Sequence, residues 1–378
     1  MNPIYLDHAA ATPLDPSVRK ALQPYCTKIY ANPSSIHEAG QRAKTALEDA
    51  RVRVAAILRA SPAEIIFTSG GTESINLALK GIAFHQGQGH IITSSIEHPA
   101  VLETCRYLET KGFSVTYLSV DRYGLISLSE LEKAIRKNTI FISIMYANNE
   151  IGTIQPLAEI SSIAKKNKIP FHTDACQAGN LNIEVTSLGV DLLTLNGPKI
   201  YGPAGIGILY KKSSVLLEPL LHGGGQEWGW RSGTENVSGI IGFATALELI
   251  QKNKSKENNR QAALRDYFIQ KILDTIPETV LNGHPTQRVP NNINIAFKGV
   301  EAEALVHYLS QKGIYISMGS ACTSTEIKLS PVLKAIQVPS KYAIGSIRIT
   351  LGKETTKKEL DVVAKELRKI IETIRKVR

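Results

Sequence analysis

Short β-rich runs alternate with helical patterns between residues 64 and 210, and this alternation limits the fold more than any other feature of the chain. The β-rich runs are Glu64–Thr68, His90–Thr93, Ser114–Leu118, Thr139–Met145, Ile169–Thr173, Val190–Leu195 and Ile206–Tyr210. Most are separated by helical patterns, at Ser74–Phe84, Ala100–Lys111, Leu128–Arg136 and Leu157–Asn167. Strands connected through helices pair in parallel, because each helix returns the chain to the same end of the sheet. We therefore predict an α/β fold with a large domain built on a mostly parallel, seven-stranded sheet.

A smaller α+β domain is expected to follow. The chain becomes polar at Gln251–Gln261, inside a long helical stretch, and we place the boundary there. Beyond it the patterns predict strands and helices at Asn291–Phe297, Ala302–Gln311, Pro331–Ile336 and Ser346–Leu351. A last amphipathic helix follows, for which Thr356 and Glu359 can form a capping box. We expect residues 15–255 to form the large domain, and residues 256–378 with residues 1–14 to form the small one.

Polar or glycine-rich clusters follow nearly every predicted strand of the large domain. In an open α/β sheet, ligands bind outside the carboxyl ends of the strands. The first such cluster, Gly70-Gly71-Thr72, opens a helix. Its glycines let the backbone approach a ligand, and free N–H groups at the helix start attract an anion. The cluster predicts a phosphate cradle, with ordinary helix capping as the alternative.

Three further strand ends carry side chains that suit a flat, charged ring. His98 lies between Glu97 and a proline, so its imidazole has a fixed direction in which it can stack or move protons. The carboxamide of Asn149 can donate to a ligand oxygen. Asp174 would be costly to bury without a cation, and a protonated pyridine nitrogen is such a cation. A structural histidine, a turn-forming asparagine and a helix N-cap are the respective alternatives.

Lys199 belongs to the last cluster in this series. It lies between Gly197-Pro198 and Tyr201-Gly202, so a stiff backbone holds it at a strand exit. A partly desolvated lysine can attack a carbonyl as an amine, although a surface lysine in a tight turn is the simpler interpretation for this residue alone. A phosphate cradle, an imidazole, an acid for a ring nitrogen and an amine together are what pyridoxal phosphate (PLP) requires. The clusters therefore predict a PLP site.

The predicted small domain contributes a cysteine and an arginine. Cys322 lies in a run of small residues, 317–325, which is typical of a loop that can bring a nucleophile to a site and withdraw it. Arg348 lies on a predicted strand, and its guanidinium suits a carboxylate if the side chain faces inward. An incidental cysteine in a turn and a surface arginine are the alternatives.

Composition narrows the function further. No apolar run is long enough to span a bilayer and the first residues do not resemble a signal peptide, so we expect a cytoplasmic protein without membrane contact. The four cysteines are far apart and form no C-x-x-C pair, so neither a metal site nor a disulfide framework is expected. The net charge of +10 leaves an acidic partner open. Without an RNA-binding module or an unbroken basic block, we expect no direct contact with nucleic acid.

As a set, the motifs resemble those of cysteine desulfurases that supply sulfur for iron–sulfur clusters, within the class V aminotransferases of PLP fold type I. The matching segments run almost from end to end: Tyr5-Leu6-Asp7, Asn32-Pro33-Ser34-Ser35, Phe67–Glu73, 97–102, Asn148–Gly152, Asp174–Gln177, Lys199–Gly207, 223–227, 231–236, Gly319–Ser324 and Ser346–Gly352. The resemblance implies a homodimer.

The resemblance also assigns a role to each site residue. Those expected at the cofactor are Lys199 as its covalent carrier, His98 on its ring, Asp174 at the ring nitrogen, Asn149 and Gln177 at the phenolic oxygen, and Gly71, Thr72 and Asn196 near the phosphate. Thr234 is expected to reach the phosphate of the neighbouring subunit. Arg348 and Asn149 would hold the substrate carboxylate. Cys322 would take sulfur from L-cysteine, leaving alanine and a persulfide for an acceptor in iron–sulfur assembly or tRNA thiolation.

One departure from the family lies beside the key lysine. Members commonly read Ser-x-His-Lys, whereas this chain reads Asn196-Gly197-Pro198-Lys199. Asn196 can offer an amide N–H to a phosphate, but Pro198 offers no donor. We therefore expect a phosphate pocket with fewer side-chain bonds. A selenocysteine lyase or another class V aminotransferase is the enzyme alternative, and a non-catalytic scaffold that has lost its cofactor is the alternative from another class.

Overall fold

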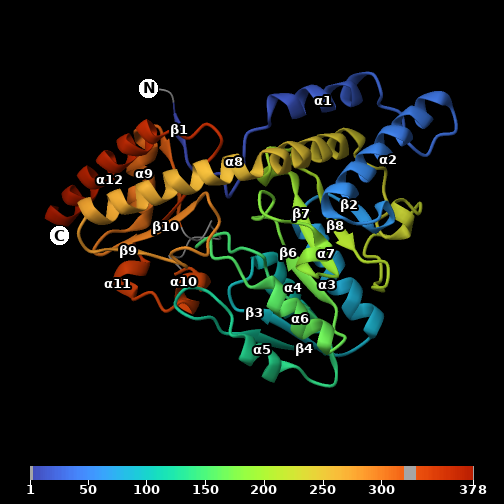
Figure 1. The fold of residues 1–378 in the computed structure, drawn as a ribbon, viewed down its shortest axis with the longest axis horizontal. Helices are drawn as coiled ribbons and strands as arrows, with labels where there is room; N and C mark the ends of the chain where they lie inside the picture. Colours follow the sequence, from blue (N-terminus) through green and yellow to red (C-terminus); the bar gives the residue numbers. More distant parts are fainter. Residues whose placement is uncertain (1–2, 319–328, 378) are drawn as a thin grey trace.

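The computed structural model describes residues 3–318 and 329–377 and shows two lobes joined by a long helix (Figure 1). The large lobe contains a seven-stranded sheet in the order β2-β8-β7-β6-β5-β3-β4. Its strands are β2 (Ile65–Thr68), β3 (His90–Ser94), β4 (Ser114–Leu118), β5 (Thr139–Ser143), β6 (Phe171–Asp174), β7 (Leu192–Asn196) and β8 (Gly207–Lys211). Only β8 runs against its two neighbours, while the other adjacent pairs are parallel. The predicted mostly parallel sheet is confirmed.

Alternate residues of these strands enter two separate apolar cores, because successive side chains of a strand point to opposite faces. Ile66, Ile91 and Phe141 pack with helices α3 (Gly71–Gln86) and α4 (Pro99–Glu109). Their sequence neighbours Phe67, Ile92 and Ile142 pack in the other core. The helices that contribute to that core are α1 (Pro16–Thr27), α2 (Glu38–Leu58), α5 (Leu128–Ala134), α6 (Leu157–Lys166), α7 (Val185–Leu188) and the first part of α8 (Val237–Thr275). The sheet is therefore covered on both faces.

The small lobe has its own core. An antiparallel sheet in the order β12-β13-β10-β9 lies beside a parallel pair, β1-β11. The elements are β1 (Ile4–Tyr5), β9 (Thr279–Leu281), β10 (Asn292–Phe297), β11 (Ile314–Tyr315), β12 (Ser317–Met318), β13 (Ser346–Thr350), α9 (Ala302–Gln311), α10 (Pro331–Ala335), α11 (Ser340–Ala343) and α12 (Lys357–Val377). The predicted capping box of α12 is present, since Thr356 N donates to Glu359 and Glu359 N donates to Thr356 Oγ1.

Helix α8 carries the chain from one core to the other without interruption. Phe243 and Leu247 pack in a large-lobe core, whereas Phe268 and Ile272 pack in the small-lobe core. The polar stretch that marked the expected boundary lies between these two halves of the helix. Ile4 and Leu6 also belong to the small-lobe core, which supports grouping residues 1–14 with the C-terminal part of the chain. The division at residue 255 stays a prediction.

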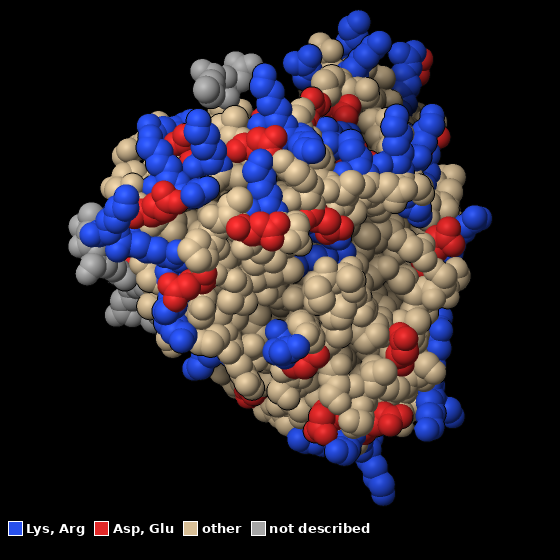
Figure 2. Space-filling model, turned by 60° about the vertical axis from the view of Figure 1, so that its left-hand side comes forward, with Lys and Arg blue, Asp and Glu red and all other residues tan. Residues whose placement is uncertain are grey.

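Basic side chains crowd the upper part of the face drawn in Figure 2, with acidic side chains among them. Lys357, Lys358 and Lys365 of α12 are exposed, and they contribute to the positive net charge. No helix within residues 3–318 and 329–377 is both long and apolar enough to cross a membrane.

Candidate active site

The carboxyl ends of β2, β3, β5, β6 and β7 share one edge of the sheet, and most of the predicted site residues lie there. Asp174 and Asn196 end their strands, while Lys199 follows three residues after β7. The pKa of His98 is lowered mainly by burial, and the charges of Asp174 and Lys199 also act on it. The structure therefore brings together the imidazole, the carboxylate and the amine that the sequence predicted from separate clusters.

The predicted phosphate cradle begins α3. Gly70 has φ +152°, a conformation that disfavours a side chain. A Cβ on Gly71 would lie 2.9 Å from Cys176 Sγ and 3.6 Å from Asn196 Nδ2, so the ends of β6 and β7 pack directly against the glycine backbone. Thr72 is exposed at the first turn. The buried Oδ1 of Asn196 has no hydrogen-bond partner, which marks this amide as one with bonding capacity left over.

His98 is also the N-cap of α4. Its Nδ1 accepts a hydrogen bond from Ala100 N at 3.1 Å, which places the proton of the neutral ring on Nε2. Nδ1 of His98 thus has a structural role as a helix cap, which was the alternative given for this residue. The ring is only partly buried, and Nε2 remains for another partner.

Asp174 is 6% exposed, and its Oδ1 accepts from Cys176 N at 2.9 Å. That bond closes a local turn rather than capping a helix, so the N-cap alternative is wrong. Within the described part of the chain, no lysine, arginine or histidine lies at ion-pair distance from this carboxylate. A buried carboxylate without a cation is costly, and the site therefore suits a ligand that supplies a positive charge.

Lys199 ends the short 3-10 turn η2 (Gly197–Lys199) and is partly buried. With Cys176 and Gln177 it lines a small cavity of about 40 Å³. The turn is held from outside, because the carbonyl of Pro198 accepts from Thr12 N at 2.8 Å and from Thr12 Oγ1 at 2.9 Å. The side chain of Lys199 therefore projects from a backbone that is fixed on both sides, as the sequence predicted.

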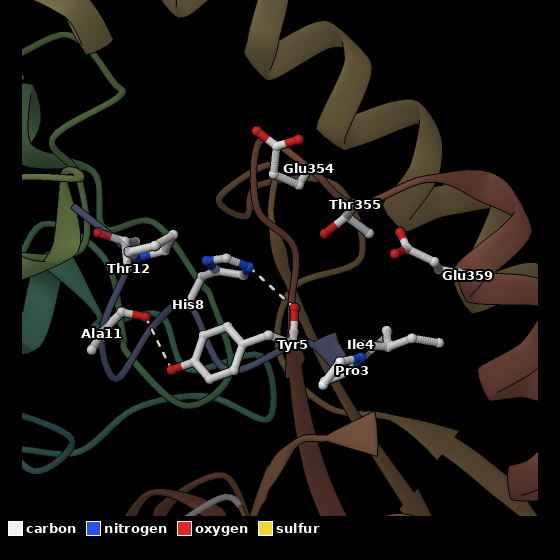
Figure 3. A pocket seen from close by; sticks show the side chains of 10 residues that line it. Pro3, Ile4, Tyr5, His8, Ala11, Thr12, Glu354, Thr355 and Glu359 are labelled. Carbon is white, nitrogen blue, oxygen red and sulfur yellow. Dashed lines mark hydrogen bonds between the residues drawn. The ribbon is translucent and has the colours of Figure 1, made fainter. Parts of the chain in front are cut away.

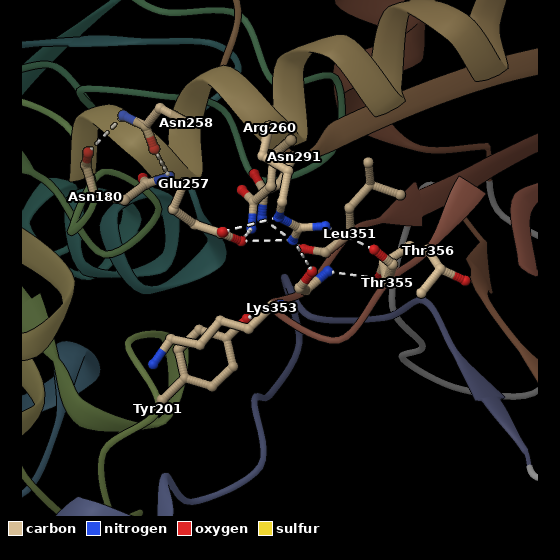
Figure 4. A network of polar contacts seen from close by, with 12 residues as sticks. Asn180, Tyr201, Glu257, Asn258, Arg260, Asn291, Leu351, Lys353, Thr355 and Thr356 are labelled. Carbon is tan, nitrogen blue, oxygen red and sulfur yellow. Dashed lines mark hydrogen bonds and ion pairs between the residues drawn. The ribbon is translucent and has the colours of Figure 1, made fainter. Parts of the chain in front are cut away.

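The small lobe also fixes this turn. Tyr201, two residues after the lysine, has φ +63° and accepts from Lys353 N at 2.8 Å (Figure 4). The Lys353 ammonium lies 4.2 Å from the centre of the Tyr201 ring. In the same network Arg260 of α8 donates to the carbonyls of Gly352 and Thr355. Helix α8 thus ties the segment after β13 to the lysine turn.

The N-terminal segment is the part of the site for which the residue patterns predicted no role. Gln177 Nε2 donates to the carbonyl of Ala9 at 3.0 Å, so one end of this predicted cofactor residue is already used. Tyr5 Oη donates to the Ala11 carbonyl, and His8 Nε2 contacts the Tyr5 carbonyl at 3.2 Å (Figure 3). A cavity of about 380 Å³ lies beside Tyr5 and His8, but Lys199 does not line it.

Arg348 is 3% exposed and faces inward, so the surface alternative for this residue is wrong. Its Nη1 donates to the Asn149 carbonyl at 3.0 Å, and its Nη2 donates to Asp7 Oδ1 at 2.8 Å. Its buried Nε has no partner among the described residues. Asn148, by contrast, is the turn-former, because its Oδ1 accepts from Glu150 N and Ile151 N. Asn149 meets the arginine through its main-chain carbonyl.

One predicted site residue, Thr234, is not brought to this edge. Thr234 is exposed on the segment before α8, where the neighbouring Arg231 forms an ion pair with Glu73 of α3 at 2.9 Å. Cys322 lies outside the described residues. The described parts of the chain on either side of it are β12, which pairs with β13 at Arg348, and α10.

Glu97 is a buried carboxyl that sequence reasoning missed, although it precedes His98. Its Oε1 accepts from Ser94 Oγ at 2.6 Å and from Met145 N at 3.0 Å, so it joins the segments after β3 and β5. Burial raises its pKa to about 8, although both donors act in the opposite direction. The group is therefore neutral over most of the physiological pH range.

Replacing Glu97 with Gln should flatten the pH dependence of unfolding. The folded-state pKa lies above the ordinary value of 4.5, so the contribution of Glu97 to stability is complete below about pH 4.5 and is lost as the pH rises toward 8. Gln keeps an acceptor oxygen and cannot ionise, so by pH 9 the variant should gain roughly 1–4 kcal/mol relative to wild type. Urea unfolding at several pH values measures this, and parallel profiles for the two proteins would contradict it.

A family profile and individual relatives both match nearly the whole chain. The profile of the family described as aminotransferase class-V matches residues 4–363. The cysteine desulfurase IscS of Dictyoglomus turgidum is 50% identical over 378 residues, which cover 99% of this chain and 96% of that protein. The cysteine desulfurase IscS of Methanosarcina thermophila is 51% identical over 375 residues, with coverage of 98% and 93%.

Solved structures show the same relationship. A NifS-like protein superposes with a TM-score of 0.92 at 38% identity, covering 98% of this chain and 100% of its own. A structure described as SspA in complex with cysteine gives a TM-score of 0.82 at 39% identity, covering 92% and 98%. The family profile and these nearly full-length relatives together show that the chain belongs to the class V aminotransferase family, among its cysteine desulfurases.

Proposed function

We propose that the protein is a PLP-dependent cysteine desulfurase that removes sulfur from L-cysteine, releases L-alanine and holds the sulfur as a persulfide on Cys322. The observation that carries this proposal is the buried Asp174 carboxylate, which has no cation among the described residues and lies at the same sheet edge as Lys199. Relatives of nearly the same length are named cysteine desulfurases, and one structural neighbour was solved with cysteine.

The residues present fit the cofactor of this family. Asp174 can pair with a protonated ring nitrogen, and the backbone of Gly71, with no space for a side chain, can approach a phosphate. Asn196 can donate an amide N–H to that phosphate, since its Nδ2 lies beside Gly71. When bound, PLP withdraws electrons from the substrate carbons through its ring. Asp174 would keep that ring protonated, and Lys199 would hold the cofactor covalently and move protons with its amine.

Arg348 and Asn149 would hold the substrate carboxylate. The guanidinium is already aimed by Asp7 and by the Asn149 carbonyl, so little side-chain entropy remains to be lost on binding. The imidazole of His98 would cover the ring, with its Nδ1 fixed by the helix cap. These roles follow the resemblance of the motifs, and the geometry of Arg348 supports its part.

Cys322 is the proposed nucleophile. Cys105 and Cys176 are buried, and burial raises the pKa of Cys105 to about 12 and that of Cys176 well above 9.0, so both thiols stay protonated. In the proposed step the Cys322 thiolate attacks the substrate sulfur and forms an S–S bond while the substrate Cβ–S bond breaks. The carbon takes the electron pair and a proton to become the methyl group of alanine, and the sulfur is oxidised.

The direct test incubates the purified protein with L-cysteine and quantifies alanine and protein-bound persulfide, with the modified residue mapped by mass spectrometry. One alanine per persulfide on Cys322 is the expected first-turnover result. Release of selenide from selenocysteine without activity on cysteine would indicate the lyase alternative. A colourless protein that cannot be reconstituted with PLP would indicate the non-catalytic scaffold.

The departure at Pro198 makes a separate prediction about cofactor retention. The Pro198 carbonyl is held by Thr12, but the residue has no donor to offer a phosphate. Pro198→His should therefore tighten PLP binding by about 10- to 150-fold, the effect of one added hydrogen bond to a charged group. Titration of the apoprotein with PLP measures this, with Pro203→Ala as a control at a nearby proline. Equal affinities of the wild type and Pro198→His would contradict the prediction.

The proposal also includes a sulfur-acceptor protein, a homodimer and a cytoplasmic location. An iron–sulfur scaffold or a tRNA-thiolation protein would take the sulfur. The segment that carries Thr234 exposes the apolar side chains of Leu221 and Trp228, 44% and 51% exposed, which supports a subunit contact there. Light scattering of the PLP-loaded protein tests the dimer.

A further inference from the structure

The loop after β5 has a role that the motifs of the site do not explain. Asn148 and Asn149 shape the loop and meet Arg348, but the next residue, Glu150, points its carboxyl elsewhere. Glu150 is 8% exposed, and its Oε2 accepts a hydrogen bond from Ser330 Oγ at 2.5 Å. The two residues are separated by 180 positions in the sequence. The buried carboxyl group of Glu150 thus forms a hydrogen bond with Ser330, which belongs to the other lobe.

Ser330 can direct its proton only toward Glu150. It is the N-cap of α10, and its Oγ accepts from Val332 N at 3.1 Å and from Leu333 N at 3.2 Å. These two bonds use the lone pairs of the hydroxyl, so its single proton is left for the carboxylate. The capping bonds therefore orient the Ser330 hydroxyl so that its proton points at Glu150.

An apolar contact reinforces this hydrogen bond. Val332, Leu333 and Ile336 form one buried cluster with Ile151, the residue after Glu150, and with Met145 and Ile96. Ile96 and Met145 belong to the segments that Glu97 joins. Helix α10 is therefore attached to the loops at the ends of β3 and β5, beside His98 and Asn149.

Helix α10 follows the predicted nucleophile, Cys322, closely in the sequence. Cys322 lies eight positions before Ser330 in the sequence. On its other side, β12 pairs with β13 so that Ser317 lies opposite Arg348. The described residues nearest to Cys322 on both sides are thus attached to the Asn149–Arg348 contact, one through the β12–β13 ladder and the other through Glu150 and Ser330.

We propose that Glu150 is a positioning residue for sulfur transfer, because its bond to Ser330 holds the α10 end of the Cys322 segment against the substrate-binding loop. The inference rests on the proposed function, since it concerns the thiol that receives the sulfur. We expect substrate binding to be independent of this bond, because Arg348 Nη1 reaches the Asn149 carbonyl without Glu150. Loss of the bond should therefore slow persulfide formation and leave cysteine binding intact.

The test uses the PLP-loaded protein and separates binding from transfer. The absorbance change of the cofactor on addition of L-cysteine gives the dissociation constant. Rapid quenching and mass spectrometry give the rate of the first persulfide on Cys322. For Glu150→Ala and Ser330→Ala we expect this rate to fall about 10- to 100-fold, the usual cost of a misplaced reacting group, with a dissociation constant within about threefold of wild type.

Matched variants distinguish the contact from general damage. Glu150→Gln keeps an oxygen that accepts from Ser330, and Ser330→Thr keeps the hydroxyl, so both should stay within about threefold of wild type in the rate. Ser340→Ala, at an exposed serine that begins α11, is the control for a serine-to-alanine change. The double variant Glu150→Ala/Ser330→Ala should be no slower than the slower single variant, because both changes remove one contact.

The outcomes are separable from those of the proposed function. A wild-type protein that forms neither alanine nor persulfide would overturn the proposed function itself. A wild type that forms both, while Glu150→Ala keeps the normal transfer rate, would overturn only the positioning role. Equal losses in binding and transfer, or single effects that multiply in the double variant, would also overturn it. Thermal unfolding of every variant shows that the rates refer to folded protein.

Discussion

Lys199→Ala is expected to abolish covalent attachment of PLP and to lower cysteine desulfurase turnover at least about 10²- to 10⁴-fold, the range contributed by a positioned acid–base group. The physical reason is the fixed turn that carries the lysine. Gly197 has no space for a side chain, since a Cβ there would lie 2.4 Å from the Pro203 carbonyl, and Thr12 holds the Pro198 carbonyl.

Borohydride reduction of the PLP-loaded protein, followed by peptide mapping, measures the attachment. The wild type should carry reduced cofactor on Lys199, and Lys199→Ala should carry none. Lys254→Ala is the matched control, because Lys254 lines the same small cavity but its Nζ donates to Gln251 at 3.0 Å. Cofactor recovered on another lysine of the wild type would remove Lys199 from its proposed role.

Cys322→Ala should eliminate persulfide formation while cysteine still changes the absorbance of the bound cofactor. The thiolate is the only atom of the proposed step that accepts sulfur, so sustained turnover should fall by at least about 10³-fold, comparable to removing a covalent nucleophile. Binding should survive because Arg348 and Asn149 hold the substrate independently of Cys322 in this proposal.

Three cysteine controls accompany this variant. Cys105→Ala should keep the normal persulfide yield, because that thiol is buried and remains protonated. Cys26→Ala tests an exposed thiol on α1. Cys176→Ala tests the thiol packed against Gly71. Persulfide retained in Cys322→Ala and lost in one of the other three would move the nucleophile to that residue.

Much of the fold followed from the sequence because strands and helices leave local patterns. The seven predicted strands of the large lobe are all present, with ends that shift by at most a few residues. The strand beginning at Ile169 in the prediction begins at Phe171 in the structure, since Pro170 has no N–H to donate to a ladder. The roles assigned to the site residues stay predictions, although the structure places Asp174, His98 and Lys199 close enough for their charges to interact.

The strand pattern alone shows which side chains leave the sheet at one edge, because the carboxyl ends of parallel strands must share that edge. How the two lobes complete the site depends on long-range packing, which the pattern does not show. Asp7 meets Arg348 across 341 positions, and Glu150 meets Ser330 across 180. Such contacts form between segments that are far apart in the chain, and they have no periodicity or spacing that a linear sequence could reveal. Because these groups are buried, each contact provides a partner for a polar group that would be costly to leave unpaired.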